Sequence, residues 1–111
     1  MSLVPRHIAI IPDGNRRWAR ANRLPLEAGY DRGAERFRDV IRVAVRAGIP
    51  FLTIWAASES NLTTRSPQEV RTLRRLVHRE LTALARSPDL VRYGIRVRVI
   101  GRAAELLRDP K

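Results

Sequence analysis

Short apolar runs alternate along this chain with longer segments in which apolar residues recur every three or four positions. The runs at residues 7–11 and 51–56 have the length of buried strands, and polar, turn-forming residues follow each of them. A third run, residues 94–100, alternates partly between apolar and basic side chains, which is typical of a strand with one wetter face. The pattern therefore predicts three strands.

Helical spacing fills the intervals between these runs. We expect a short helix from about Arg16 to the residue before Pro25, and a second from about Asp31 to Ala47. A third helix is expected after Ser66, because a capping serine, a proline at the first position and a glutamate three residues on form a start signal. A last short helical segment is expected to close the chain.

The resulting order, β-α-α-β-α-β-α, predicts an α/β fold in one unit, with a parallel sheet and flanking helices. Ligands of such sheets bind beyond the carboxyl ends of the strands. Two of those ends, residues 12–15 and 56–61, are also the most polar loops of the chain. We therefore look for a site there.

The charge balance indicates the kind of ligand. Lys and Arg total 22 against 11 Asp and Glu, a net charge of +11, and Lys111 is the only lysine. Arginine pairs bidentately with phosphate, so the partner is expected to be a nucleic acid, an anionic membrane surface met peripherally, or a phosphorylated small molecule. Six aromatic residues offer little material for base stacking, which disfavours nucleic acid.

Two absences narrow the class of protein further. The sequence has no Cys, which excludes a disulfide framework, a thiolate metal site and a cysteine nucleophile. No apolar run approaches the ~20 residues of a membrane-spanning helix, and we expect a cytoplasmic protein.

The segment from Asp13 to Trp18 carries the most distinctive chemistry. Gly14 would let the backbone approach a ligand, and the arginines at positions 16, 17 and 20 would attract an anion. Asp13 among these cations is typical of a carboxylate that holds Mg²⁺ against a phosphate. The alternative is a tight turn in which Asp13 caps the helix and the arginines form a solvated face.

Two further polar groups of residues admit a functional and a structural interpretation. Residues 58–61 (Ser-Glu-Ser-Asn), with Arg65 nearby, could bind an anion or orient a substrate, or could form an ordinary hydroxyl-rich loop. Arginines on the third predicted helix are expected to form a solvated face opposite its apolar stripe, with a nucleic-acid patch as the alternative; they are Arg71, Arg74, Arg75 and Arg79.

Residues 7–19, HIAIIPDGNRRWA, closely resemble the signature of the cis-prenyltransferases, the undecaprenyl-diphosphate synthase family. Three further blocks resemble family elements in the family's order: residues 29–33 the G-H-x-x-G element, 52–70 a strand and its S-x-E-N-W-x-R-P-x-x-E-V loop, and 94–101 the G-V-R-V-R-x-I-G strand. The resemblance spans nearly the whole chain. It implies an enzyme that condenses isopentenyl diphosphate with an allylic diphosphate, with Mg²⁺, to make a cis-polyprenyl diphosphate.

The resemblance also implies roles for individual residues. Asp13 would be linked to Mg²⁺ and to the leaving diphosphate, and Asn61 would assist proton removal. The other positions implied to contact substrate are Gly14, Asn15, Arg16, Arg17, Trp18, Tyr30, Ser58 and Arg65. Four positions depart from the family pattern: Leu26 replaces an arginine, Tyr30 a histidine, Ser60 a glutamate and Leu62 a tryptophan.

One family motif has no counterpart in these residues. Family members are about twice this long, a usual size for one domain, and an R-x-G-E-x-R-x-S-x-F motif in their C-terminal half binds isopentenyl diphosphate. We therefore interpret residues 1–111 as the N-terminal half of an incomplete cis-prenyltransferase-type fold, which holds the allylic-diphosphate half-site and turns over weakly or not at all alone. A homodimer, or a partner chain that supplies the missing half, is the expected assembly. A non-catalytic accessory subunit is the main alternative, ahead of a basic nucleic-acid-binding module.

Overall fold

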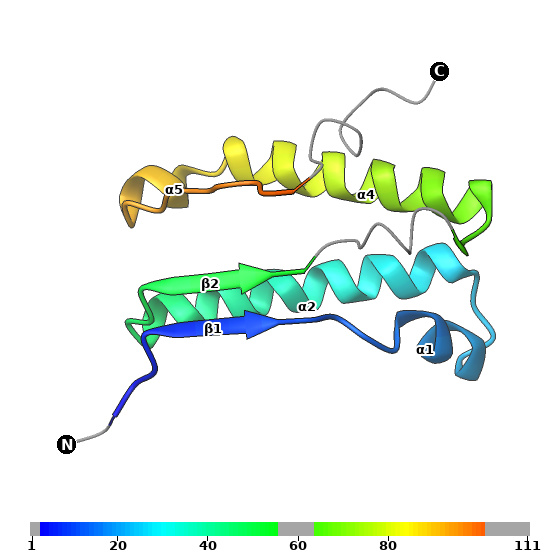
Figure 1. Cartoon of the computed structure of the whole chain (residues 1–111), viewed down its shortest axis with the longest axis horizontal. Coiled ribbons are helices and arrows are strands. Elements are labelled where there is room, and N and C mark those ends of the chain that lie inside the picture. Colours follow the sequence, from blue (N-terminus) through cyan, green and yellow to red (C-terminus); the bar gives the residue numbers. More distant parts are fainter. Residues whose placement is uncertain (1–2, 56–63, 102–111) are drawn as a thin grey trace. The chain divides into compact units, whose positions relative to one another are not determined.

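The computed structural model describes residues 3–55 and 64–101 of the chain, which divides into two compact units, Met1–Ser58 and Glu59–Lys111 (Figure 1). Helices and a small parallel sheet make up these residues, so the predicted α/β class is confirmed. The first unit contains β1 (His7–Ile10), α1 (Asn15–Ala21), α2 (Leu26–Arg46) and β2 (Phe51–Ile54); the second contains α4 (Pro67–Ala85) and α5 (Pro88–Arg92).

The two strands of the first unit pair in parallel, in a register that sets His7 opposite Phe51 and Ile10 opposite Ile54 (Figure 1). The side chains on one face of the sheet, Ile8 among them, are half-buried, whereas those on the other face are exposed. The first strand is expected to be buried, and in the described residues only one of its faces is half-buried while the other is exposed. On the exposed face, His7 Nε2 lies 2.7 Å from Thr53 Oγ1, a hydrogen bond that joins the strands.

Helix α1 follows β1 after a short connection, and it begins where the sequence predicts. Its N-cap is Gly14, whose φ of +93° is a left-handed conformation that glycine adopts without strain. The backbone N–H of Trp18 donates to the Gly14 carbonyl, 2.8 Å away, which closes the first helical turn. Helix α2 begins at Leu26, five residues before the predicted start, because the extended backbone of Pro25 (ψ 152°) already supplies its N-cap.

Both helices of the first unit end in the same hydrogen-bonded motif. After α1, the N–H groups of Arg23 and Leu24 donate to carbonyls of the last turn, and the residue in the left-handed conformation is Arg23, with φ +54°. After α2, the same pattern places Gly48 in that position, with φ +73°. The predicted stop at Gly48 is confirmed, and Arg23 is a strained counterpart of it.

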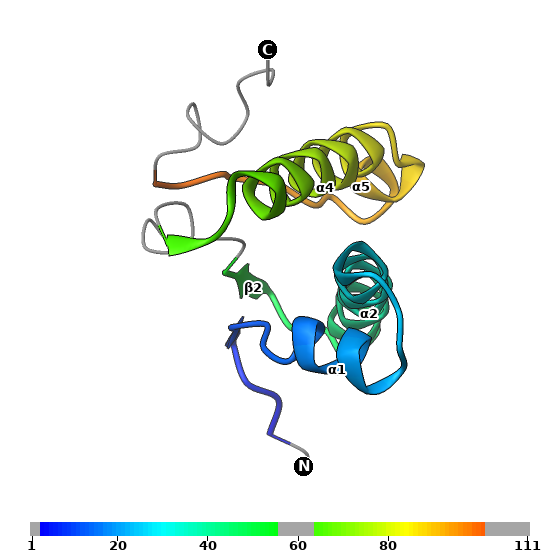
Figure 2. The ribbon, with the colours of Figure 1, turned by 90° about the vertical axis from the view of Figure 1, so that its right-hand side faces the viewer.

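Small residues form the contact between α1 and α2, which lie side by side in Figure 2. Ala19 of α1 is completely buried, and Gly29, Tyr30 and Ala34 are the buried residues on the first half of α2. Because Ala19 and Gly29 put little side chain between the helices, the two backbones can approach closely. This contact holds the start of α1, and with it the segment after β1, against α2.

Helix α4 of the second unit begins as its sequence predicts. Ser66 Oγ accepts a hydrogen bond from the Glu69 N–H at 3.2 Å, and Pro67 occupies the first position of α4. After α4 ends, Ser87 repeats this arrangement and caps α5, a helix that the sequence analysis did not predict. No described helix combines the length and the hydropathy that a membrane crossing requires.

The predicted third strand, residues 94–100, is wrong for the described structure. Residues 95–100 contain no regular element, and Ile100 is 80% exposed. A strand needs a backbone ladder as well as alternating side chains, and no described segment pairs with these residues. The closing helix predicted after Gly101 lies outside the described residues.

One arginine of α4 departs from the predicted solvated face. Arg71, Arg75 and Arg79 are exposed, but Arg74 is half-buried, and its Nε is shielded from solvent without a hydrogen-bond partner among the described residues. At 100° per residue, position 74 falls only about 40° from Val70 around the helix, within the apolar stripe. The expectation is therefore wrong for Arg74 alone.

Candidate diphosphate site

The predicted site residues from Asp13 to Trp18 form one continuous segment that leads from the end of β1 into the first turn of α1 (Figure 1). Backbone geometry brings them together, because Gly14 turns the chain directly into the helix. Asn15 and Arg16 are half-buried, whereas Arg17 and Trp18 are exposed. The segment therefore combines a positioned amide with cations that solvent can reach.

Asp13 forms an ion pair rather than a helix cap. Its Oδ2 lies 3.0 Å from Arg17 Nη2, and the side chains are 83% and 75% exposed, respectively. No side chain caps α1, which removes the alternative in which Asp13 is a capping residue. An exposed pair of this kind contributes about 0–1 kcal/mol, so an incoming phosphate can displace the aspartate from Arg17 at little cost.

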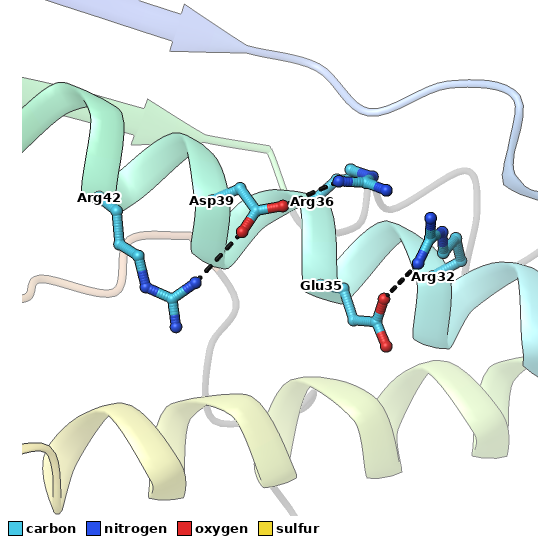
Figure 3. Close-up of polar contacts among 5 residues, drawn as sticks. All are labelled: Arg32, Glu35, Arg36, Asp39 and Arg42. Atoms are coloured by element: carbon cyan, nitrogen blue, oxygen red, sulfur yellow. Dashed lines mark hydrogen bonds and ion pairs between the residues drawn. The ribbon is translucent and has the colours of Figure 1, made fainter.

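The excess positive charge of the first unit is concentrated on α1. Three of the seven residues of α1 are arginines and none is acidic. On α2, by contrast, arginines alternate with acidic residues, and Figure 3 shows how they pair: Arg32 with Glu35 at 2.7 Å, and Asp39 with both Arg36 and Arg42 at 2.9 and 3.1 Å. Because these acids offset the arginines of α2, α1 is the stronger attractor of an anion.

Asn15 is the residue of this segment that the fold constrains most. It opens α1, and it lies against the two glycines of α2, Gly29 and Gly33. A Cβ atom at Gly29 would overlap the backbone oxygen of Asn15, and one at Gly33 would lie 2.6 Å from its side-chain Oδ1. In the sequence these glycines belong to the motif at residues 29–33, and their spacing of four residues, about one helical turn, is a signal of a close helix contact.

The remaining predicted site residues are distributed differently. Tyr30, on α2, is 4% exposed, so its packing has to open before a ligand can touch its ring. Arg65 belongs to the second unit, where its Nε lies 4.0 Å from Glu69 Oε2. Ser58 and Asn61, with the departures Ser60 and Leu62, lie outside the described residues.

The donor set at Asp13 suits Mg²⁺ only in combination with a phosphate ligand. Among the described residues, no three or more His, Cys, Asp or Glu side chains gather closely enough to hold a metal ion by themselves. Mg²⁺ is usually bound by one or two carboxylates together with substrate phosphates and water. One exposed carboxylate beside phosphate-binding arginines fits that mode.

Comparison with known proteins gives one consistent family. The family model described as "Putative undecaprenyl diphosphate synthase" matches residues 11–111. A tritrans,polycis-undecaprenyl-diphosphate synthase (GGDP specific) from Sulfolobus acidocaldarius is 41% identical over 107 residues, which are 96% of this chain and 41% of that protein. An isoprenyl transferase from Aquifex pyrophilus is 46% identical over 98% of this chain and 46% of its own length, and one from Brucella suis is 41% identical over 95% and 40%. The chain thus spans less than half the length of these relatives.

Proposed function

The chain belongs to the undecaprenyl diphosphate synthase family, and from this premise we propose that it serves prenyl transfer, the condensation of isopentenyl diphosphate with an allylic diphosphate. Within that reaction, we propose that the segment from Asp13 to Trp18 binds the allylic diphosphate. Residues 1–111 constitute the N-terminal half of the enzyme and turn over weakly or not at all without the other half. The names of the relatives support the assignment to prenyl transfer, and the share of their length that the chain covers supports its interpretation as half of the enzyme.

The chemistry places a specific demand on this segment. In prenyl transfer the allylic C–O bond breaks, the diphosphate departs with the bonding electrons, and the allylic carbon bonds to the double bond of isopentenyl diphosphate, which then loses a proton. Arg16 and Arg17 offset the charge that accumulates on the departing diphosphate. Asp13 would hold Mg²⁺, which supplies additional neutralisation when bound. Asn61 remains the candidate for assisting proton removal.

The observation that carries the proposal is the contrast between Asp13 and Asp39. Both are exposed aspartates paired with arginine, but Asp39 sits among the compensating charges of α2, whereas Asp13 adjoins a helix with three arginines and no acid. The surroundings of Asp13 thus combine a carboxylate for Mg²⁺ with an excess of cations for a diphosphate.

Calorimetric titration of the chain with geranylgeranyl diphosphate, with and without Mg²⁺, tests the half-site. We expect binding that depends on Mg²⁺ and that Asp13→Asn weakens at least tenfold, as expected for an interaction with a charged group. Asp39→Asn is the matched control, because it removes the same unit of charge from an exposed, arginine-paired aspartate, and it is expected to leave affinity unchanged.

Product formation tests the proposal that the chain turns over weakly or not at all by itself. Incubation of the chain with both diphosphates and Mg²⁺ is expected to give little or no polyprenyl product. Efficient condensation that requires Asp13 would refute the interpretation as half an enzyme, and absence of Mg²⁺-dependent binding would refute the half-site.

A second candidate function is an accessory subunit that completes its fold with another chain. The exposed face of the sheet favours it, since Phe51 and Trp55 are 59% and 53% exposed there. Large exposed apolar side chains on a sheet face are typical of a surface that another element covers. Co-purification with a protein that carries the R-x-G-E-x-R motif would support this function, and a monodisperse monomer in sedimentation experiments would count against it.

A further inference from the structure

Two glycines on α2 contact different parts of the same residue. Gly29 faces the main chain of Asn15, because a Cβ there would overlap the Asn15 backbone oxygen and approach the Ala19 Cβ to 3.1 Å. Gly33, one turn later, faces the side chain: the three atoms nearest to a Cβ there would be Oδ1 of Asn15, at 2.6 Å, and its Cγ and Nδ2, both at 3.0 Å. The polar end of Asn15 therefore rests in the space that the missing side chain of Gly33 leaves.

The two contacts differ in how they can yield. A backbone carbonyl within the first turn of α1 cannot move unless the helix moves with it, so a side chain at Gly29 would force α1 and α2 apart. A carboxamide can rotate about its two side-chain torsions. A methyl group at Gly33 is thus accommodated by turning the Asn15 side chain away, while the two helices keep their contact.

We propose that Gly33 is a positioning residue, which fixes the Asn15 carboxamide so that its Nδ2 can donate to the diphosphate held beside Asp13. The ligand in this inference rests on the proposed function, whereas the placement of the carboxamide rests on the geometry alone. Asn15 directly follows Gly14 and Asp13, so its amide and the metal-binding carboxylate are held by the same turn. Binding groups lose much of their effect when displaced by about 1 Å, and a side chain at position 33 would force such a displacement on the Asn15 carboxamide.

Nuclear magnetic resonance of the full chain, labelled with ¹⁵N in the asparagine side chains, tests the placement without a ligand. The sequence has three asparagines, at positions 15, 22 and 61, and the signal lost in Asn15→Ala assigns the one of interest. Gly33→Ala is expected to shift the Asn15 amide signal while the far-ultraviolet circular dichroism stays that of the parent chain. Gly29→Ala is the matched comparison, in which the same added methyl group is expected to lower the unfolding midpoint.

Affinity for geranylgeranyl diphosphate with Mg²⁺ tests the functional part in a double-mutant cycle. Asn15→Ala is expected to weaken binding about tenfold, the effect of one hydrogen bond to a charged group. Gly33→Ala is expected to weaken it to a similar degree, and the double variant no further than Asn15→Ala alone, because Gly33 acts only through Asn15.

The outcomes separate this inference from the proposed function. An unmoved Asn15 signal in Gly33→Ala, or affinity losses that add in the double variant, would overturn the role of Gly33 while leaving the half-site intact. A parent chain that binds no diphosphate would overturn the proposed function and, with it, the assigned ligand. A shifted signal together with non-additive losses supports the inference.

Discussion

Arg23 allows the cost of a strained backbone position to be measured against a control within the same unit. It holds the left-handed position after α1, with φ +54°, whereas Gly48 holds the equivalent position after α2. A residue with a side chain loses about 1–2 kcal/mol of stability in that conformation. Glycine avoids this strain, but its larger unfolded-state entropy costs roughly 0.5–1 kcal/mol of the gain. Arg23→Gly is therefore expected to stabilise the unit by about 0.5–1 kcal/mol, and Gly48→Ala to destabilise it by a similar amount.

Urea and thermal unfolding, followed by tryptophan fluorescence, measure both changes, because the only two tryptophans, Trp18 and Trp55, lie in the first unit. The expected shifts in Tm are about 2–8 °C, upward for Arg23→Gly and downward for Gly48→Ala. A Cβ at Gly48 would meet no atom within 4 Å, so its effect is one of backbone conformation and not of a clash.

Arg23→Ala separates the backbone from the charge. It removes the same positive charge as Arg23→Gly but keeps a Cβ, and it is expected to bring no stabilisation. If Arg23→Gly failed to stabilise, or if Arg23→Ala stabilised as much, then repulsion among the arginines and not the left-handed backbone would be the dominant cost, and the reasoning would be wrong.

Three further changes test other elements. Ser66→Ala removes the cap of α4 and is expected to cost about 1 kcal/mol, seen as faster hydrogen exchange in the first turn of α4, whereas unchanged exchange would show that the cap is dispensable. Arg74→Leu removes a shielded Nε, without a hydrogen-bond partner among the described residues, from the apolar stripe, and it is expected to be neutral or stabilising by up to about 1 kcal/mol. Arg75→Leu, at an exposed position, is the contrasting control, and circular dichroism melting measures both. Clear destabilisation by Arg74→Leu would mean that Arg74 has an essential partner. Asp39→Asn breaks two exposed ion pairs of α2 and is expected to cost less than about 1 kcal/mol, and a loss that persists in 1 M salt would contradict a Coulombic origin.

Local signals in the sequence predict much of this fold. The starts of α1 and α4 and the end of α2 follow from turn and cap chemistry that acts within a few residues, and the structure has them where expected. The start of α5 carried the same signal, since Ser87 and Pro88 repeat the pattern of Ser66 and Pro67. The same pair also follows directly after α4, so it is equally compatible with a helix end.

Features that depend on distant partners were harder to predict. Alternation over residues 94–100 describes side chains, but a strand also requires a neighbouring backbone. The burial of Tyr30 likewise depends on which faces meet. For the candidate site, the sequence predicted the residues that we propose to carry the chemistry, whereas the closeness of Gly33 to the Asn15 side chain depends on how α1 and α2 pack together.

The two-stranded sheet has a colloidal consequence. Among the described residues each strand pairs with only one neighbour, so each presents a backbone edge to which a strand of another molecule could add. A net charge of +11 makes the molecules repel one another. The range of this repulsion is the Debye length, which is about 30 Å in 0.01 M salt and about 3 Å in 1 M salt. Concentrated salt would thus remove the long-range repulsion and leave the edges free to meet, so dilute buffer is the medium in which this protein stays dispersed.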